Sequence, residues 1–367
     1  MIAGDISMKG EMLRKIEIAG YRSIRNAAID LSNINILIGA NGAGKSNFIS
    51  VFTLIQKMIS LDLQSTVSKY GATSLLYNGP KETDEIMIKA SFDNSAYGFT
   101  LKPTDDERMF FSDEYFLSGP ECLRSSAGKG HFESKWRDIV SNVDDCYISS
   151  FLSAESWCVY HFSDTSETSL MRRPHSVHDN LFLSQDARNI APFLLRLMDE
   201  YPSDYRNIVS TLRMVAPSFK DFVLIPNSNT EEVMLRWTKD GYDDVMGSNQ
   251  LSDGILRFVC LTTLLLQPED LRPTTIILDE PELGLYPQAM IYLAEMIKSV
   301  GQTNQLIIST QSADLVDEFL PEDIIFVKDD GIGTEFSRLE PDRFNGWLED
   351  GYTLGLLWKK NLLTGVH

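Results

Sequence analysis

Cysteine is scarce in this sequence, and its four cysteines are too far apart to act together. They are Cys122, Cys146, Cys158 and Cys260, and no Cys-x-x-Cys motif occurs. This spacing excludes a zinc knuckle and a disulfide framework. We therefore expect four free thiols in a reducing environment, and a cytoplasmic protein.

Basic residues are also in deficit. The chain has 33 lysines and arginines against 52 aspartates and glutamates, a formal net charge of −19. Such a charge disfavours a protein that coats nucleic acid by neutralising phosphates, although it allows one local basic face. We predict that the isolated chain binds DNA weakly, with a steep dependence on salt.

The sequence contains no long apolar run. The longest, Phe258 to Leu266, is interrupted by Thr262 and Thr263 and is much shorter than the roughly 18 residues of a membrane-spanning helix. Residues 1–12 lack the apolar centre of a signal peptide. No heptad pattern persists over the three or four repeats that a coiled coil requires. We expect no membrane association and no long coiled-coil arm.

The patterns that are present indicate an α/β protein. Short alternating runs between Glu85 and Leu117 predict antiparallel hairpins, and the polar residues 124–131 predict a loop. Residues 186–218 have helical periodicity, and after residue 250 helix and strand patterns alternate, which is typical of a parallel sheet. We predict a flexible N-terminus, a first lobe, a helical insertion, an alternating α/β segment and a helical tail, over residues 1–12, 13–185, 186–250, 251–340 and 341–367.

The strongest motif is a glycine-rich loop between an apolar strand pattern and an amphipathic helix pattern. It has the complete G-x-x-x-x-G-K-S spacing of a P-loop in the expected strand–helix context. Glycines let backbone N–H groups close around phosphate oxygens, and the following helix points its positive end at them. We predict that ATP or GTP binds here, with the lysine at the β- and γ-phosphates and the serine at Mg²⁺. The loop residues are Gly39, Ala40, Asn41, Gly42, Ala43, Gly44, Lys45 and Ser46.

Three shorter motifs follow in the second half of the chain. Residues 275–282 form an apolar strand pattern that runs into Asp279 and Glu280. These two side chains are suited to hold Mg²⁺ and to polarise an attacking water. Residues 250–257 read QLSDGILR, in which Ser252 is a plausible helix N-cap, but alone they would indicate no more than a capped helix. Residues 309–312 (STQS) close a further strand pattern.

The order of these motifs resembles that of the ATP-binding cassette (ABC) ATPases, and within them the RecF/SMC/OLD-type branch of predicted bacterial AAA-type ATPases. Tyr21-Arg-Ser-Ile-Arg25 resembles the motif between the first two strands of that branch, and residues 282–287 (ELGLYP) resemble its D-loop. The resemblance covers roughly residues 13–363. It implies a P-loop NTPase head of the ABC type, with a mixed or parallel sheet core, an antiparallel β lobe and a helical lobe.

The resemblance also implies how the motifs work together. The family forms head-to-tail dimers, or larger even-numbered oligomers, around two ATP molecules. Ser252, Asp253 and Gly254 would then complete the site of the other subunit, while Asp279 would join Ser46 at Mg²⁺. Further nucleotide contacts would come from Arg22, Ser23 and Asn47, and catalysis from Glu280 and Gln311. A separately encoded effector, such as a TOPRIM-like nuclease, is the implied partner.

The sequence departs from the family pattern at several positions. Gln311 stands where a histidine is most common, and Tyr286 replaces the usual histidine of the D-loop. No glutamine marks the Q-loop. His161 and Asp164 are candidates for a water-mediated contact to Mg²⁺, against the simpler interpretation of a strand at the edge of the core. Three functions stay open: an ATPase switch in DNA maintenance or anti-phage defence, a transporter-type nucleotide-binding subunit, and an ATP-bound scaffold with little turnover.

Overall fold

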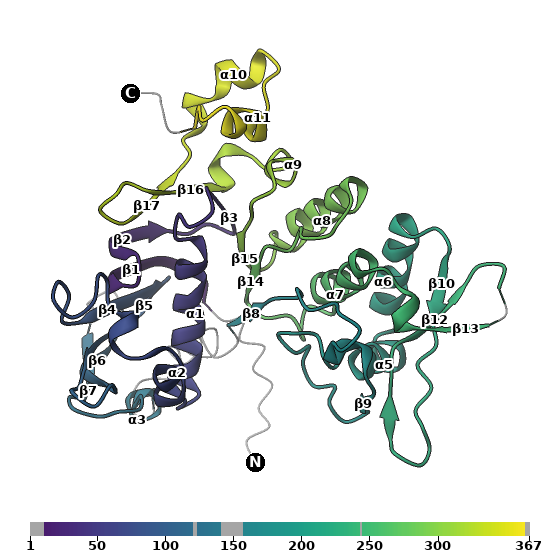
Figure 1. Cartoon of the computed structure of the whole chain (residues 1–367), viewed down its shortest axis with the longest axis horizontal. Coiled ribbons are helices and arrows are strands. Elements are labelled where there is room, and N and C mark those ends of the chain that lie inside the picture. The colour runs from purple at the N-terminus through teal and green to yellow at the C-terminus, as the bar shows by residue number, and fades with distance from the viewer. Residues whose placement is uncertain (1–10, 120–122, 141–156, 243, 364–367) are drawn as a thin grey trace.

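A computed structural model of the chain describes residues 11–119, 123–140, 157–242 and 244–363. Cys122, Cys146 and the first ten residues of the predicted flexible N-terminus lie outside these ranges. Figure 1 shows two main parts, a lobe built on strands β1, β2 and β4 to β7 and a lobe rich in helices, joined through a central sheet that contains β3.

The central sheet confirms the predicted mixed, largely parallel core. Its strand order is β17-β16-β3-β15-β14-β8, with only β17 antiparallel to its neighbour. Strands covered on both faces are largely apolar, and Ile36, Leu37 and Ile38 in β3 are fully buried. Because parallel strands end at one edge, the segments after β3, β14 and β15 meet there. The strands are β3 (Ile34–Ile38), β8 (Cys158–Tyr160), β14 (Thr275–Asp279), β15 (Gln305–Ser309), β16 (Ile324–Asp329) and β17 (Thr334–Arg338).

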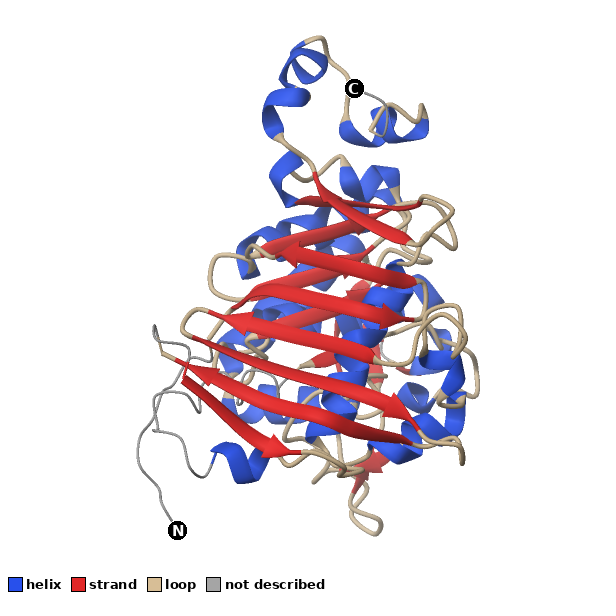
Figure 2. Ribbon diagram, turned by 90° about the vertical axis from the view of Figure 1, so that its left-hand side faces the viewer, coloured by secondary structure: helices blue, strands red, loops and turns tan. Residues whose placement is uncertain are grey.

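The second six-stranded sheet is fully antiparallel, in the order β2-β1-β4-β5-β6-β7. In the view of Figure 2 its strands lie in front of the helices, which cover its inner face. The predicted hairpins are confirmed here. The strands are β1 (Leu13–Tyr21), β2 (Ile24–Asp30), β4 (Ile86–Phe92), β5 (Ser95–Pro103), β6 (Met109–Ser118) and β7 (Leu123–Gly128).

The prediction of a loop over residues 124–131 was wrong, because most of this segment is strand β7. It pairs with β6 through register partners such as Phe116 and Ser125. As an edge strand, β7 is exposed or half-exposed along its whole length. It therefore needs no alternation of apolar and polar residues, which is the signal that identifies a strand in a sequence.

Helix α1 (Lys45–Ile59) lies between the two sheets and follows the glycine-rich loop directly. Its predicted apolar positions, Phe48, Ile49, Phe52, Ile55 and Ile59, are all buried. Phe52 packs edge-on against Trp157, which in turn stacks on Phe92 of the antiparallel sheet. The aromatic contacts thus fix the helix that carries the loop against both sheets. Two shorter helices follow in this lobe, α2 (Leu63–Tyr70) and α3 (Trp136–Val140).

The other lobe packs helices on the far face of the central sheet. The predicted helical segment 186–218 forms two helices, with Pro202 at the first position of the second, where its missing N–H costs nothing. Its helices are α5 (Ile190–Glu200), α6 (Pro202–Val215), α7 (Asp253–Leu266) and α8 (Pro287–Val300). Its small sheets contain β9 (His175–Ser176) with β11 (Glu232–Val233), and β10 (Phe219–Phe222), β12 (Arg236–Lys239) and β13 (Val245–Gly247).

The C-terminal tail is helical, as predicted, with α10 (Asn345–Glu349) and α11 (Leu354–Lys359). It packs on α9 (Ala313–Val316), the short helix that follows residues 309–312. A Cβ atom at Gly355 would lie 2.3 Å from the carbonyl oxygen of Ala313, so only glycine permits this approach. Among the described helices, none is both long enough and apolar enough to cross a membrane.

A buried carboxylate organises the bottom of the antiparallel lobe. Glu114 in β6 is fully buried, and its carboxylate accepts hydrogen bonds from Tyr97, His131, Ser134 and the backbone N–H of Lys135. The same segment continues to Trp136, whose indole N–H donates to the carbonyl of Ile59 at 2.9 Å. The carboxylate therefore ties the sheet to the end of α1 through side chains that cannot find water.

Replacing Glu114 by alanine should lower the free energy of unfolding by about 3 kcal/mol, because several buried donors lose their acceptor. The matched control is Asp113→Ala, which removes a neighbouring carboxylate whose partner Arg124 lies at the surface. It should cost less than about 1 kcal/mol. Urea unfolding followed by circular dichroism measures both, and equal losses would contradict this account of Glu114.

Candidate functional site

The glycine-rich loop is shaped by close contacts that exclude side chains. Gly42 and Gly44 have φ angles of 80° and 108°, a region that glycine adopts without strain. A Cβ atom at Gly39 would lie 2.1 Å from the carbonyl oxygen of Val327, and one at Gly44 would lie 2.1 Å from the hydroxyl of Thr334. Strands β16 and β17 therefore lie against the loop, and packing requires glycine at positions 39 and 44.

Lys45 is a buried cation without a buried anion beside it. Its side chain is only 5% exposed, and its ammonium donates to the carbonyl oxygens of Gly39 at 2.7 Å and Ala40 at 3.1 Å. Of the carboxylates that the structure describes, none lies within ion-pair distance of this ammonium. Burial lowers the pKa of Lys45, an effect opposed at longer range by Glu280, Asp279 and Glu282. A site that holds a cation in this way fits an anionic ligand such as a polyphosphate.

The turn between β1 and β2 lies against the same loop. The Ser23 hydroxyl is 2.7 Å from that of Thr334, and it accepts a hydrogen bond of 2.6 Å from the side-chain amide of Asn47. Arg22 has a φ angle of 50°, and its guanidinium lies 5.2 Å from the centre of the Tyr70 ring. The structure thus brings the sequence-predicted Ser23 and Asn47 together beside Lys45. Thr334 joins them, although no local motif marks it.

The acidic residues lie at the same edge of the central sheet. Asp279 ends β14 and accepts a hydrogen bond from the hydroxyl of Ser309 at the end of β15. The backbone N–H of Glu280 donates to the Ser309 carbonyl at 3.0 Å, and the Glu280 φ angle is 47°. The side-chain amide of Gln311 donates to the Glu280 carboxylate. The two predicted catalytic side chains are therefore in contact, and Ser309 is a further polar residue of this edge.

Glu282 is a buried carboxylate whose two oxygens have different surroundings. One oxygen accepts from the backbone N–H of Gln311 at 2.9 Å, and the other has no hydrogen-bond partner within the described part of the chain. Burial raises the pKa of Glu282, and the nearby Glu280 acts in the same direction. Glu282 therefore links residues 279–282 to the Gln311 segment at an electrostatic cost.

The two Q-loop candidates have different surroundings. His161 follows strand β8, and its Nδ1 atom lies 3.9 Å from the Asp279 carboxylate. The Asp164 carboxylate instead accepts from the backbone N–H and the hydroxyl of Ser166, bonds that lower its pKa. The interpretation as an edge strand is confirmed for residues 158–160, and His161 is the candidate that lies at the acidic edge.

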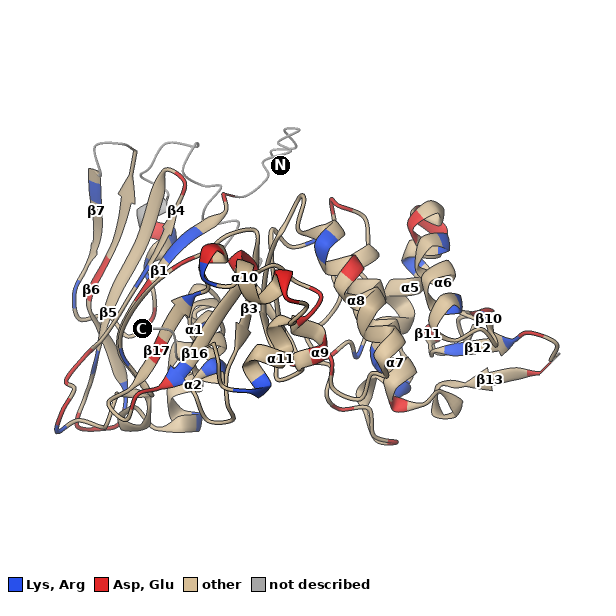
Figure 3. Cartoon of the chain, turned by 90° about the horizontal axis from the view of Figure 1, so that it is seen from above, with Lys and Arg blue, Asp and Glu red and all other residues tan. Residues whose placement is uncertain are grey.

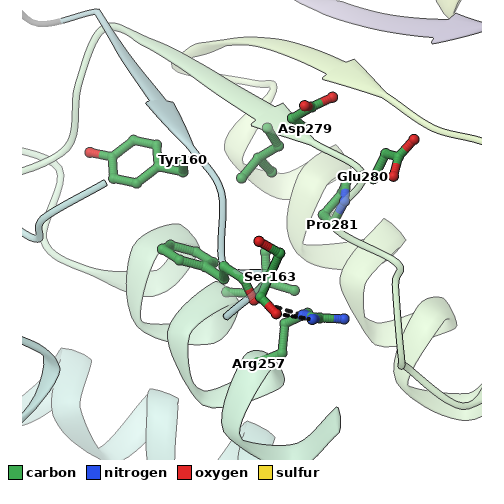
Figure 4. A pocket seen from close by; sticks show the side chains of 9 residues that line it. Tyr160, Ser163, Arg257, Asp279, Glu280 and Pro281 are labelled. Carbon is green, nitrogen blue, oxygen red and sulfur yellow. Dashed lines mark hydrogen bonds between the residues drawn. The ribbon is translucent and has the colours of Figure 1, made fainter. Parts of the chain in front are cut away.

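A small pocket opens beside this edge (Figure 4). Its labelled residues come from β8 and the segment after it, from the end of β14 and the turn that follows, and from α7. Arg257 of α7 donates to the carbonyl oxygens of Phe162 at 2.8 Å and Ser163 at 3.0 Å, which fixes the segment after His161. The lining residues are Tyr160, Phe162, Ser163, Arg257, Leu261, Leu278, Asp279, Glu280 and Pro281.

The LSDG segment starts helix α7, as predicted. Ser252 is the N-cap, and its hydroxyl accepts from the backbone N–H of Ile255 at 3.4 Å. Ser252 and Asp253 are both exposed. A Cβ atom at Gly254 would lie 2.4 Å from the carbonyl oxygen of Gly284, so this glycine allows the ELGLYP turn to approach the helix. Across the described residues, no hydrogen bond joins Ser252 or Asp253 to the glycine-rich loop of the same chain.

Charged residues are dispersed over the molecule. In the view of Figure 3, lysines and arginines alternate with acidic residues along both lobes, and no continuous basic stripe is visible. Weak DNA binding by the isolated chain stays a prediction, which rests on the net charge of −19.

The sequence matches the family model AAA_21, described as "AAA domain, putative AbiEii toxin, Type IV TA system", over residues 34–317. None of the curated proteins matches the chain.

Several solved structures share the fold. An Smc head bound to the C-winged helix domain of ScpA is 15% identical, with a TM-score of 0.63 over 91% of this chain and 99% of that one. An Smc head with an extended coiled coil, bound to the C-terminal domain of ScpA from Pyrococcus furiosus, is 14% identical with a TM-score of 0.58 over 92% and 98%. An Smc head domain with a coiled coil and joint, derived from Pyrococcus yayanosii, is 12% identical. Its TM-score is 0.54 over 92% of this chain and 99% of that one.

The buried position of Glu282 predicts a pH effect on stability. Because burial raises its pKa, the folded chain binds this proton more tightly than the unfolded chain does. The free energy of unfolding should therefore fall as the pH rises from the ordinary pKa of glutamate, about 4.3, through the raised pKa of Glu282 in the folded chain. Glu282→Gln cannot titrate and should remove this part of the fall. Urea unfolding at a series of pH values measures it, and parallel profiles for the two proteins would contradict the prediction.

Proposed function

This chain belongs to the AAA_21 family and shares the fold of Smc heads, and we propose that it is an ABC-type ATPase of the RecF/SMC branch, a dimeric switch that binds and hydrolyses ATP. The observation that carries the proposal is the buried Lys45 ammonium, held on carbonyl oxygens near a set of acidic side chains. A cation placed in this way gains its counter-charge when a triphosphate binds.

The chain's own residues divide the work of nucleotide binding. Backbone N–H groups of the loop Gly39–Ser46 surround the phosphates, and Lys45 turns from the loop carbonyls to the β- and γ-phosphates. Ser23 and Asn47, already hydrogen-bonded to each other, face the same loop. Arg22, which precedes Ser23 in the sequence, would join them after leaving the Tyr70 ring.

A Mg²⁺ ion fits the oxygen-rich edge formed by the helix start and the acidic residues. Ser46 is exposed at the first turn of α1, and Asp279 has one carboxylate oxygen that is not bonded to Ser309. These two residues would hold the ion, with His161 beside Asp279 as a water-mediated contact. Bound there, Mg²⁺ would neutralise charge that develops on the phosphates.

Glu280 is the proposed general base. Its carboxylate is held at the mouth of the site by Gln311, which cannot titrate but can donate a hydrogen bond to a phosphate oxygen. When a γ-phosphate takes this donor, Glu280 becomes free to accept the proton of an attacking water. Gln311 thus couples detection of the γ-phosphate to release of the base.

A second copy of the chain would complete the site. Ser252 is exposed at the start of α7, and within the described ranges it forms no hydrogen bond with the glycine-rich loop of its own chain. A head-to-tail arrangement places this helix start against the γ-phosphate of the partner, with both sites equivalent by two-fold symmetry. Such a dimer opens and closes with the nucleotide.

The biological role proposed for this switch is DNA maintenance or anti-phage defence with a separately encoded partner. The description of the family names a toxin–antitoxin system, and such a system has a second component. Two of the similar Smc heads are bound to ScpA, a separate protein, in their structures. A nuclease effector encoded beside this chain remains our specific prediction. The weak DNA affinity expected from its charge would leave DNA contact to that partner.

Two other functions have less support. A transporter-type subunit would carry LSGGQ and a clear Q-loop, whereas this chain has LSDGI and no glutamine that marks a Q-loop. A scaffold that keeps ATP without turnover would not require Glu280 and Gln311 to meet at the site.

Replacing Glu280 by glutamine should leave ATP binding intact and reduce hydrolysis by about a hundredfold or more, because the base can no longer accept a proton. The ATP-bound dimer should therefore accumulate. Phosphate release and light scattering in the presence of ATP measure the two effects. Hydrolysis at the native rate would show that another residue orients the water, and a chain that stays monomeric with ATP would overturn the dimeric switch.

Mixing two defective variants tests the shared site. Ser252→Arg places a bulky cation at the helix start that should meet the partner's γ-phosphate, and Lys45→Ala removes ATP binding in its own subunit. Each variant alone should be inactive. A mixed dimer has one site with both defects and one with neither, so partial ATPase activity should return. Absence of rescue in dimers shown by mass spectrometry to be mixed would contradict a role of Ser252 in the other subunit's site.

A further inference from the structure

The third residue of the LSDG segment poses an electrostatic problem. Asp253 lies at the start of α7, directly after Ser252, and its side chain is 69% exposed. In the dimer proposed above, this helix start approaches the γ-phosphate bound by the other subunit. A carboxylate beside a phosphate repels it, and like charges that face each other across an interface weaken the association of the two subunits. The helix start therefore requires a compensating cation.

Arg172 supplies such a cation from a different part of the chain. It belongs to a short turn in residues 170–172, and its side chain is 7% exposed. Its Nη2 atom lies 3.0 Å from the Asp253 carboxylate, and the same nitrogen donates to the carbonyl oxygen of Leu251 at 3.4 Å. Nη1 donates to the carbonyl of Ser248. One guanidinium thus contacts both the acidic side chain and the backbone that leads into the helix.

The Arg172 side chain is also anchored on the side away from Asp253. Its Nε atom donates to the carbonyl oxygen of Thr165 at 3.0 Å, and the Ser248 hydroxyl lies 3.4 Å from the carbonyl of Arg172 itself. Because the guanidinium is planar, the hydrogen bond at Nε fixes the direction in which Nη1 and Nη2 donate. The ion pair with Asp253 is therefore prepared before any partner arrives, although Asp253 itself is exposed.

Arg257 is the other cation near Asp253, but its hydrogen bonds go elsewhere. Two of its nitrogens donate to the carbonyls of Phe162 and Ser163. Burial lowers the pKa of Arg257, and Asp253 opposes that effect from a distance. Among the described residues, Arg172 is the cation that bonds the Asp253 carboxylate.

We propose that Arg172 is a positioning residue that neutralises Asp253 and turns it away from the γ-phosphate of the other subunit, so that an acidic signature segment can close on ATP. The inference rests on the dimeric function proposed above and adds to it a residue from outside every nucleotide-binding motif. Ser252 and the backbone N–H groups at the start of α7 then supply the donors, while Asp253 serves as an internal partner of Arg172.

The test measures the ATP concentration for half-maximal dimerisation, in the Glu280→Gln chain, where the dimer accumulates. Arg172→Met should raise this concentration about tenfold, since the Asp253 charge is left uncompensated. Arg173→Met is the matched control, because it removes an adjacent, exposed arginine and should change the value less than about twofold. Binding of ADP, which has no γ-phosphate, should stay within about twofold in both variants.

A second substitution separates charge neutralisation from a purely structural role. Arg172→Met combined with Asp253→Asn removes both charges and should return the ATP requirement close to that of the reference chain. If Arg172 only supported the carbonyls of Thr165, Ser248 and Leu251, the double variant would be as defective as Arg172→Met. That result would overturn the inference.

Arg172→Lys provides a test that does not depend on the methionine variant being folded. It keeps the positive charge near Asp253 and loses the fork that holds the carbonyls, so dimerisation should stay within about threefold of the reference. A lysine variant that is folded by circular dichroism but fails to dimerise would contradict the inference. A reference chain that does not dimerise with ATP would instead remove the proposed function, and this inference with it.

Discussion

The buried ammonium of Lys45 is the constraint on which the site depends. A cation removed from water needs compensation, and here it comes from two loop carbonyls and, at longer range, from the acidic residues at the end of β14. This incomplete compensation requires a stiff loop, because a flexible one would let the lysine turn out to solvent. The stiffness comes from glycines pressed against Val327 and Thr334, two residues of the hairpin formed by β16 and β17.

The acidic side of the site is organised by the same parallel sheet. Strands β14 and β15 end side by side, so Asp279 meets Ser309, and Glu280 meets Gln311, without any long connection. Glu282 accepts the backbone N–H of Gln311 and thereby fixes the spacing between the two segments, even though one of its oxygens is buried without a partner. Positive and negative groups are thus kept apart at this edge of the sheet, and in the proposed function a bound triphosphate with Mg²⁺ would lie between them.

The helical lobe positions the exposed start of α7, the surface that a second subunit would contact in the proposed dimer. Arg257 fastens the segment after His161 to α7, and Arg172 fastens the start of α7 to the turn that ends at residue 172. Both arginines are buried and bond mainly to carbonyl oxygens, so the geometry of the helix start is set by the interior of the lobe. A partner subunit would therefore meet a preformed surface, which lowers the cost of ordering it on association.

The sequence alone determined the residues whose roles follow from local spacing. The glycine-rich loop, the acidic pair after an apolar strand and the capped helix at Ser252 each lie within a few consecutive residues, and their backbone requirements are local. Strand β7 was missed because an edge strand needs no apolar alternation. Thr334, Ser309 and the pairing of Arg172 with Asp253 were decided only by the tertiary structure. Thr334 lies 311 positions from Ser23, and Arg172 lies 81 positions from Asp253. Contacts of this range depend on how strands and helices pack, and no local pattern of residue types carries that information.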